Sequence, residues 1–221
     1  MTVLSIGGSI INNGSIDTDY LKNLGKLISS YHVGIVVGGG ATARQYANAM
    51  RTLTKNEFAA DECAILSTRQ NAMLMIAAIG KSAFPTAINS FAKAREAYAT
   101  GKTVVMFGTI PGITTDTDSV LLAEAIDSKK LINVSSIDGI YDKHPREHKD
   151  AKKFTTMNHA KLVELASLFD SRKAGTNFVF DSVAAKLAIR SNIELHFVSG
   201  ELKQIEAALK GKKHSGTIVK N

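Results

Sequence analysis

Three stretches of the chain run from an apolar segment directly into glycines or small polar residues, and a segment with helical spacing follows each. They are LSIGGS (Leu4–Ser9), GIVVGGGATAR (Gly34–Arg44) and VVMFGTIPGITTD (Val104–Asp116). Glycines let backbone amides approach a phosphate, and the amino terminus of a helix adds partial positive charge. One such turn is typical of an ordinary tight turn. Three of them at the carboxyl edge of a sheet favour an extended anionic ligand.

No standard phosphate-binding motif accompanies these turns. The spacings G-x-x-x-x-G-K-[ST] and G-x-G-x-x-G are both absent, so the charged partners of a phosphate must come from elsewhere. Arg44 follows Gly40 by four residues, in the first turn of the next helix, from which its guanidinium could bind a phosphate through two hydrogen bonds. A surface arginine on a helix explains this position equally well.

Two aspartates follow the third turn. Asp116 ends GITTD and opens a helix, where it has two compatible roles. As an N-cap it would accept hydrogen bonds from free amides, and among phosphates it would order a metal ion or positive side chains. Asp118 lies two residues further on and is predicted to point elsewhere, as a charge of the first helical turn.

The segment SIDGIYDKHP (Ser136–Pro145) follows another predicted strand. Its Asp-Gly pair predicts a hairpin turn, and the ring of Tyr141 could instead pack on a base. The six histidines show no metal-ligand spacing, and no G-x-S-x-G element is present. Cys63 has no histidine placed to activate it. These features argue against a zinc site and against a serine or cysteine hydrolase.

The elements that position these residues alternate in type. Short and often β-branched apolar runs predict buried strands at Leu4–Ile6, Val33–Val37, Thr103–Phe107, Leu131–Val134 and Leu195–Val198. Helical spacing is found at Tyr20–Ile28, with Asp17 or Thr18 as N-cap, and at Ala72–Ile79, Val120–Ile126, Lys161–Phe169 and Val183–Ile189. Strands alternating with helices predict an α/β fold, a three-layer αβα sandwich with a mainly parallel central sheet. The polar segment Asp142–Lys153 is predicted to be a surface excursion.

Composition limits the class of protein. The 221 residues are 44% hydrophobic, which suits one domain or two joined lobes. No apolar stretch approaches the roughly 20 residues of a membrane span, and no signal peptide is evident. One cysteine excludes an internal disulfide and fits a reducing cytoplasm. A net charge of +7 with 6% aromatic residues and no tryptophan argues against a nucleic-acid binder and suits a polyanionic small substrate such as a nucleotide.

Six motifs carry a resemblance to a known family. The motifs are IGGS, VVGGGATARQY, STRQNAMLMIAA, GTIPGITTDTDSVLLAE, SSIDGIYDKHP and VFDSVAAKLAIRS. Their order and spacing are similar to those of the amino-acid kinase superfamily. Over essentially its whole length the chain resembles the archaeal-type uridylate (UMP) kinase branch. The resemblance implies the amino-acid kinase fold and transfer of the γ-phosphoryl group of ATP to UMP, giving UDP in pyrimidine nucleotide biosynthesis, with Mg²⁺ carried by ATP. It also implies a cytoplasmic homohexamer, a UMP-binding lobe over residues 1–130 and an ATP-binding lobe over residues 131–221, joined by one sheet.

The same motifs imply roles for individual residues. Asp116 falls on the organising aspartate of the superfamily, and Arg44 is the second implied catalytic residue. The implied UMP contacts are Gly39, Asp61, Ile110, Pro111, Gly112, Ile113, Thr114, Thr115 and Asp116. The implied ATP contacts are Ser5, Ile6, Gly7, Gly8, Ser9, Gly40, Arg44, Ser135, Tyr141 and His144. No protein residue is expected to be a metal ligand of its own.

The chain departs from the superfamily pattern at several positions. Ser5 stands where many members place a catalytic lysine, which the archaeal-type branch also lacks, so Arg44 and the metal ion are expected to supply the positive charge. His144 stands where an aspartate commonly precedes the proline. A second lysine used by several members is not evident near AGTNFVFD, and Lys186 lies too late to replace it.

Two alternatives remain open. One is a kinase of the same superfamily that acts on another small acid or phosphate. Among these, isopentenyl phosphate kinases would carry a histidine in the triple-glycine segment, and GGGATARQY has none. The other alternative is a non-catalytic nucleotide-binding assembly on the same fold.

Overall fold

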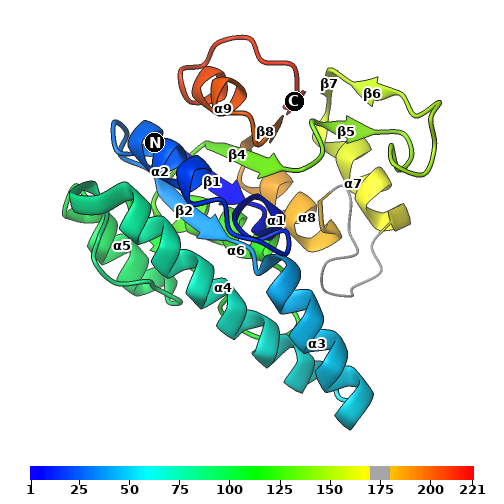
Figure 1. Ribbon diagram of the computed structural model, residues 1–221. Helices are drawn as coiled ribbons and strands as arrows, with labels where there is room; N and C mark the ends of the chain where they lie inside the picture. The colour runs from blue at the N-terminus through cyan, green and yellow to red at the C-terminus, as the bar shows by residue number, and fades with distance from the viewer. Residues whose placement is uncertain (170–179) are drawn as a thin grey trace.

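The computed structural model describes residues 1–169 and 180–221, and these residues form three layers, with a seven-stranded sheet between two layers of helices (Figure 1). The strand order is β3-β2-β1-β4-β8-β9-β7. Five strands are parallel to one another and make up most of the sheet: β1 (Val3–Ile6), β2 (Gly34–Val37), β3 (Val104–Met106), β4 (Lys130–Ser135) and β8 (Glu194–Ser199). Their residues are largely buried because helices cover both faces, as the continuous apolar runs predict. The predicted α/β fold with a mainly parallel sheet is confirmed.

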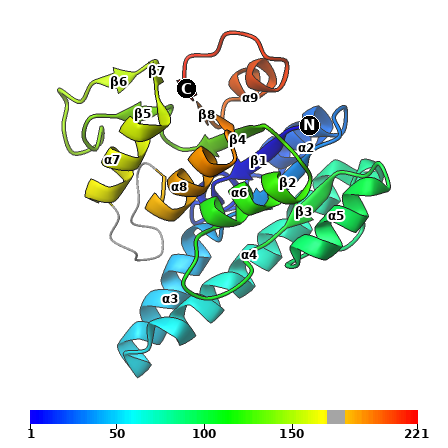
Figure 2. The ribbon, with the colours of Figure 1, turned by 180° about the vertical axis from the view of Figure 1, so that it is seen from behind.

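Two groups of helices cover the two faces. The side chains of Leu4, Ile35 and Ile132 face one group, which comprises α1 (Gly8–Ile11), α2 (Thr18–Ile28), α4 (Glu57–Ile79) and α9 (Leu202–Leu209). Alternate residues of the same strands face the other group, which comprises α5 (Phe91–Ala99), α6 (Thr115–Ala125), α7 (His159–Phe169) and α8 (Ser182–Arg190) (Figure 2). Helix α3 (Gly40–Thr54) packs against α4 and projects from the body of the molecule.

Several boundaries differ from the sequence-based expectation. The predicted helix Ala72–Ile79 is only the last part of α4, whose first half buries small or polar residues such as Ala60, Ser67 and Thr68 and therefore has no apolar stripe. Asn56 caps α4, which was not predicted. Asp17, one of the two predicted candidates, caps α2 by accepting a hydrogen bond from the amide of Tyr20 at 2.9 Å. Helices α5 and α9 and the short helix η1 (Gly80–Ser82) were not predicted.

The far edge of the sheet is not parallel to its centre. Strand β9 (Thr217–Val219) pairs antiparallel with β8, and β7 (Thr156–Met157) pairs with β9. The predicted hairpin at the Asp-Gly pair is wrong. The strand that follows this pair, β5 (Ile140–Tyr141), bonds to β6 (Lys153–Phe154) and not to β4, so the polar segment from Asp142 connects β5 to β6.

Glycines allow the turns after β1 and β2 to pack backbone against backbone. A Cβ atom on Gly8 would lie 2.0 Å from the amide nitrogen of Gly40 and 2.6 Å from the carbonyl carbon of Gly38. Gly40 has a φ of +68°, and a Cβ atom there would lie 2.4 Å from the carbonyl oxygen of Asn12. Neither position has room for a side chain.

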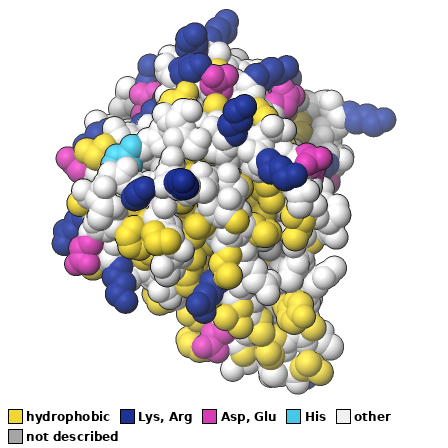
Figure 3. All heavy atoms as spheres, turned by 60° about the vertical axis from the view of Figure 1, so that its left-hand side comes forward, with side chains coloured by type: hydrophobic (Ala, Val, Ile, Leu, Met, Phe, Trp, Pro, Cys, Tyr) yellow, Lys and Arg dark blue, Asp and Glu magenta, His cyan; other side chains and the backbone are white. Residues whose placement is uncertain are grey.

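An apolar surface covers the outer faces of α3 and α4. Its large side chains are Tyr46, Leu53, Phe58, Leu66 and Met73, each at least 59% exposed. Figure 3 shows hydrophobic side chains gathered on the lower part of the molecule, toward its projecting end. No helix within the described ranges is both long enough and apolar enough to cross a membrane.

Candidate active site

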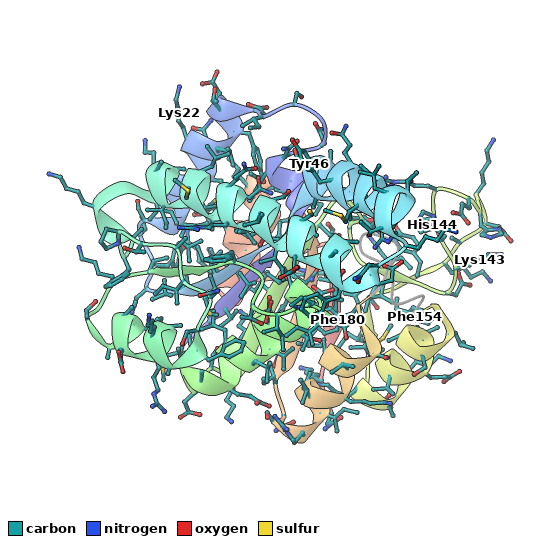
Figure 4. The ribbon with its side chains drawn as sticks, turned by 90° about the horizontal axis from the view of Figure 1, so that it is seen from below. Lys22, Tyr46, Lys143, His144, Phe154 and Phe180 are labelled. Atoms are coloured by element: carbon teal, nitrogen blue, oxygen red, sulfur yellow. The ribbon has the colours of Figure 1, made fainter. Side chains whose placement is uncertain are left out.

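A cavity of about 580 Å³ opens at the carboxyl ends of β1, β2, β3 and β4. The turns after these strands line it, together with the first turns of α3 and α6, one side of α4 and the β5–β6 connection. Figure 4 views the molecule from below, with Tyr46 on α3 and with Lys143 and His144 on the β5–β6 connection. This is the edge at which open α/β sheets bind ligands.

The cavity brings together most of the predicted site residues. From the predicted UMP contacts it includes Gly39, Asp61, Ile110, Gly112, Ile113, Thr114, Thr115 and Asp116. From the predicted ATP contacts it includes Ser5, Gly7, Gly8, Ser9, Gly40, Arg44, Ser135 and His144.

Three predicted contacts are not among the residues that line the cavity: Ile6, Pro111 and Tyr141. Ile6 is 1% exposed and packs in the core, and its carbonyl oxygen accepts a hydrogen bond from the amide of Gly38. The hydroxyl of Tyr141 donates to Asp138 at 2.7 Å. The segment AGTNFVFD, where no second lysine was evident, lies largely outside the described residues.

The glycine turn after β1 presents only part of its backbone to the cavity. The amide of Gly7 donates to the carbonyl of Val134 at 2.8 Å and so belongs to the sheet. Gly8 and Ser9 begin α1 and line the cavity, and first-turn amides have no partner within their helix. The available amide donors of this turn are therefore those of Gly8 and Ser9.

Asp116 lies at the base of the cavity and is held through one of its two oxygens. Oδ1 accepts hydrogen bonds from the hydroxyl of Ser5 at 3.2 Å and from the side-chain amide of Asn133 at 2.9 Å. Oδ2 accepts no hydrogen bond from the described residues. Burial raises the pKa of Asp116 to about 7, and the negative charge of Asp181 adds to the increase, while the bonds from Ser5 and Asn133 oppose it. A nearby cation would restore the ionised form.

The N-cap role considered for Asp116 is wrong. Helix α6 begins at Thr115, so its N-cap is Thr114, whose hydroxyl oxygen accepts from the amides of Asp116 and Thr117. The Asp116 carboxylate is therefore not used for capping. Its functional role stays a prediction, and no capping role competes with it.

Asp118 stands in the first turn of α6 and does not line the cavity, as predicted, but it is not exposed to solvent. Its side chain is 1% exposed, because the residues of α6 from Thr117 to Val120 are all buried. Oδ1 accepts a hydrogen bond from the hydroxyl of Thr109 at 2.6 Å, and Oδ2 accepts one from the amide of the same residue at 3.2 Å. Burial raises the pKa of Asp118 to about 6, against the lowering effect of these two bonds.

Sequence reasoning missed two residues that organise the site. Asn133 is a polar residue within the otherwise apolar strand β4, which is the signal that could have found it. Asp181 caps α8 by accepting from the amides of Val183 and Ala184, and it also accepts from the hydroxyls of Thr114 and Thr117. Its position before a helix is typical of an ordinary N-cap, so the sequence does not reveal the second pair of bonds.

Two arginines supply positive charge to the cavity. Arg44 is half-buried, and its Nη1 donates to the hydroxyl oxygen of Ser9 at 3.3 Å. It takes part in none of the ion pairs among residues 1–169 and 180–221. Arg146, which was not predicted, lines the cavity from the β5–β6 connection and donates to the hydroxyl of Ser136 at 2.9 Å. The segment predicted as a surface excursion thus forms one rim of the cavity.

The raised pKa of Asp116 predicts how replacing this residue changes stability with pH. Folding raises the pKa from 3.8 to about 7, so the stabilisation from the protonated carboxyl is complete below pH 4 and is lost as the pH rises toward 7. Asp116→Asn cannot ionise. We therefore expect the melting temperature of this variant to match that of the wild type near pH 4 and to exceed it at pH 8. The corresponding difference in the free energy of unfolding at pH 8 is at most about 4 kcal/mol.

Thermal unfolding of the nucleotide-free protein between pH 4 and pH 8 measures this difference. Asp127→Asn is the control, because the Asp127 side chain is 82% exposed and its replacement should not alter the pH profile. A difference between Asp116→Asn and wild type that stays constant with pH would contradict the assignment.

Comparison with known proteins places the chain among kinases. Residues 1–199 match the amino acid kinase family. The chain is 40% identical over 213 residues to the uridylate kinase of Thermoplasma volcanium, a match that covers 95% of this chain and 93% of the relative. It is also 40% identical over 222 residues to the uridylate kinase of Thermococcus onnurineus, covering 98% of each. The crystal structure of uridylate kinase from Archaeoglobus fulgidus matches with a TM-score of 0.87, at 37% identity and over 99% of both chains.

Proposed function

The chain belongs to the amino acid kinase family, and on that premise we propose that it is a uridylate kinase, which transfers the γ-phosphoryl group of ATP to UMP and releases UDP. Full-length relatives with this activity support the choice of acceptor. The observation that carries the chemistry is one cavity that holds both Asp116, with a free oxygen, and Arg44, without an acidic partner among the described residues. The reaction is a step of pyrimidine nucleotide biosynthesis, and we place it in the cytoplasm.

The residues present fit a magnesium ion that arrives with ATP. Among the residues that the structure describes, no group of three or more His, Cys, Asp or Glu side chains could hold a metal ion by itself. Mg²⁺ needs no such cage, because it keeps several waters and uses one or two carboxylates together with substrate phosphates. Asp116 would hold it through Oδ2. When bound, the ion supplies positive charge to the phosphates of the nucleotide.

The protein's own contribution is to position the two nucleotides and to compensate their charge. Phosphoryl transfer requires the two phosphates in line, and the phosphate of UMP is already an ionised nucleophile, so no general base is needed. The amides of Gly8 and Ser9 and the guanidinium of Arg44 bind the ATP phosphates. Ser5, in the place of the missing lysine, supplies no charge and instead holds the carboxylate of Asp116 in place.

The acceptor is bound by the connection between β3 and α6. In our proposal this connection wraps UMP, and Asp61 of α4 binds its ribose. Oδ2 of Asp61 accepts from the amide of Gly112 at 2.9 Å, which leaves Oδ1 for a ribose hydroxyl. Ser135 and His144, which also line the cavity, contact the adenine nucleotide. Ile6, Pro111 and Tyr141 lie outside the cavity and have no part in the proposal.

The proposed division into lobes follows the sheet. Residues 1–130 bind UMP and residues 131–221 bind ATP, while the turn after β1 and Arg44 reach the ATP phosphates from the first half. Because β1 pairs with β4, one sheet joins the two halves. We also propose that the protein is a homohexamer. The apolar surface of Tyr46, Leu53, Phe58, Leu66 and Met73 on α3 and α4 supplies an area that contacts between copies would cover.

Incubation with ATP, Mg²⁺ and each nucleoside monophosphate in turn tests the proposal. We expect UDP from UMP, and UMP preferred over CMP, AMP and GMP as acceptor. Another acceptor phosphorylated in place of UMP would support the alternative of a family kinase with a different substrate. Nucleotide binding without any transfer would support the alternative of a non-catalytic assembly.

A further inference from the structure

The connection between β3 and α6 is tied to the body of the protein at several points. The amide of Gly108 donates to the hydroxyl oxygen of Thr68 at 2.9 Å, and the amide of Gly112 donates to Asp61. Both partners lie on α4. Between these two ties, Thr109 is bound to Asp118 of α6 through its hydroxyl and its amide. The connection that lines the cavity is therefore held by α4 on one side and by α6 on the other.

Asp118 is an unfavourable residue for a purely structural position. Its carboxylate is 1% exposed, and both of its oxygens bind the same residue. A buried carboxylate loses its hydration, and an apolar residue of similar size is often as stable or more so at such a position. Asp118 takes part in no ion pair among the described residues, and the negative charge of Asp181, at the start of α8, repels it. Stability alone does not explain an aspartate here.

The two bonds explain it better, because a carboxylate accepts through both oxygens at once. Thr109 presents two donors in a fixed direction, the hydroxyl and the backbone amide. An ionised carboxylate has only acceptors and can satisfy both donors without a change in its orientation. The result is a fixed backbone at Thr109, one residue before Ile110, with which the proposed UMP contacts of this connection begin.

We propose that Asp118 is a positioning residue for the acceptor nucleotide, which it orders by fixing the connection between β3 and α6 through Thr109. The proposal rests on the assignment of this connection to UMP. Asp118 does not line the cavity and touches no reacting group. Its effect therefore appears in the binding of the acceptor and not in the binding of ATP.

Two nearly isosteric substitutions test the proposal. Asp118→Asn replaces one acceptor oxygen with a donor that opposes one of the Thr109 donors, and Thr109→Val removes the hydroxyl donor. We expect each to raise the KM for UMP about tenfold, the usual effect of losing a hydrogen bond to a charged group. The KM for ATP is expected to stay within about twofold of wild type. Thr109→Ser keeps the hydroxyl and should restore the wild-type KM for UMP.

Glu124→Gln is the matched control on the same helix. Glu124 lies at the other end of α6, where its carboxylate accepts from Arg190 and Ser191, so it undergoes the same change of carboxylate to amide far from the connection. We expect both Michaelis constants of this variant to equal those of wild type. Thermal unfolding of every variant shows whether it is folded at the assay temperature.

The outcomes separate this proposal from the proposed function. If the Asp118 and Thr109 variants raise both Michaelis constants equally, or if Thr109→Ser behaves like Thr109→Val, Asp118 is a structural residue only and the proposal is overturned. Unchanged constants in folded variants overturn it as well. If the wild type phosphorylates a different monophosphate, the uridylate assignment fails, and the same comparison with that acceptor still tests the positioning role.

Discussion

Asp116→Asn is expected to lower kcat about 10²–10³-fold while the protein still binds nucleotides. The amide can keep the hydrogen bonds from Ser5 and Asn133 through its remaining oxygen, so the fold of the site should persist. The substitution removes the negative charge and the free carboxylate oxygen that would order the magnesium ion and the positive groups around the phosphates. Losses of this size are typical when one preorganised electrostatic contact to the transition state is removed. Steady-state kinetics with ATP and UMP measure kcat, and calorimetry with each nucleotide measures the binding retained.

Two comparison variants make this result specific. Ser5→Ala removes one of the two bonds to Oδ1 and should have a smaller effect, about tenfold, because Asn133 still holds the carboxylate. Asp127→Asn changes an exposed carboxylate and should leave kcat unaltered. If Asp116→Asn retained wild-type kcat, Asp116 would not be the organising residue of the reaction.

Gly8→Ala is expected to be strongly destabilising although it adds only one methyl group. The added Cβ would lie 2.0 Å from the backbone nitrogen of Gly40, and backbone atoms cannot move aside as a flexible side chain can. The turns after β1 and β2 would have to separate, at a cost of about 3 kcal/mol or more, or roughly 10 °C in melting temperature. We also expect ATP affinity to fall more than tenfold, because the amides of Gly8 and Ser9 and the first turn of α3 would be displaced. Thermal unfolding and ATP titration measure the two effects.

Gly80→Ala is the control for this experiment. Gly80 has a φ of +69° and a ψ of −137°, and no heavy atom lies within 4 Å of the position that an added methyl group would take, so backbone strain of about 1–3 kcal/mol without a steric clash is expected. ATP affinity should not change, since Gly80 lies at the end of α4 away from the cavity. A Gly8→Ala variant with wild-type stability and wild-type ATP affinity would show that the two turns can separate at little cost.

The centre of the sheet and its glycine turns were predictable from the sequence. Strands such as β1 and β2 are short apolar runs because helices cover both of their faces, and that burial leaves a clear pattern. The cap of α2 by Asp17 was predictable because the capping bond is local. The position of Arg44 and Asp116 at one edge followed from the parallel order of the strands.

The parts that could not be predicted depend on contacts between distant segments. The first half of α4 packs through small and polar residues, so its sequence lacks the apolar period of a buried helix. Whether Asp118 faces solvent or Thr109 depends on how α6 lies against the preceding connection, which no local pattern records. Asp181 and Asn133 likewise acquire their roles from partners that lie 64 residues and 17 residues away in the chain.

The contact between Gly8 and Gly40 also bears on how the two substrates influence each other. Gly8 belongs to the turn proposed for ATP, and Gly40 directly follows Gly39, a proposed UMP contact. No side chain separates the two turns, so nothing between them can yield when one turn moves. We expect them to shift as one rigid unit, which makes each nucleotide a determinant of the other's affinity. The effect of one bound nucleotide on the affinity for the other would then depend on contacts between main-chain atoms. Substitutions of side chains at the surface of the cavity would not change it.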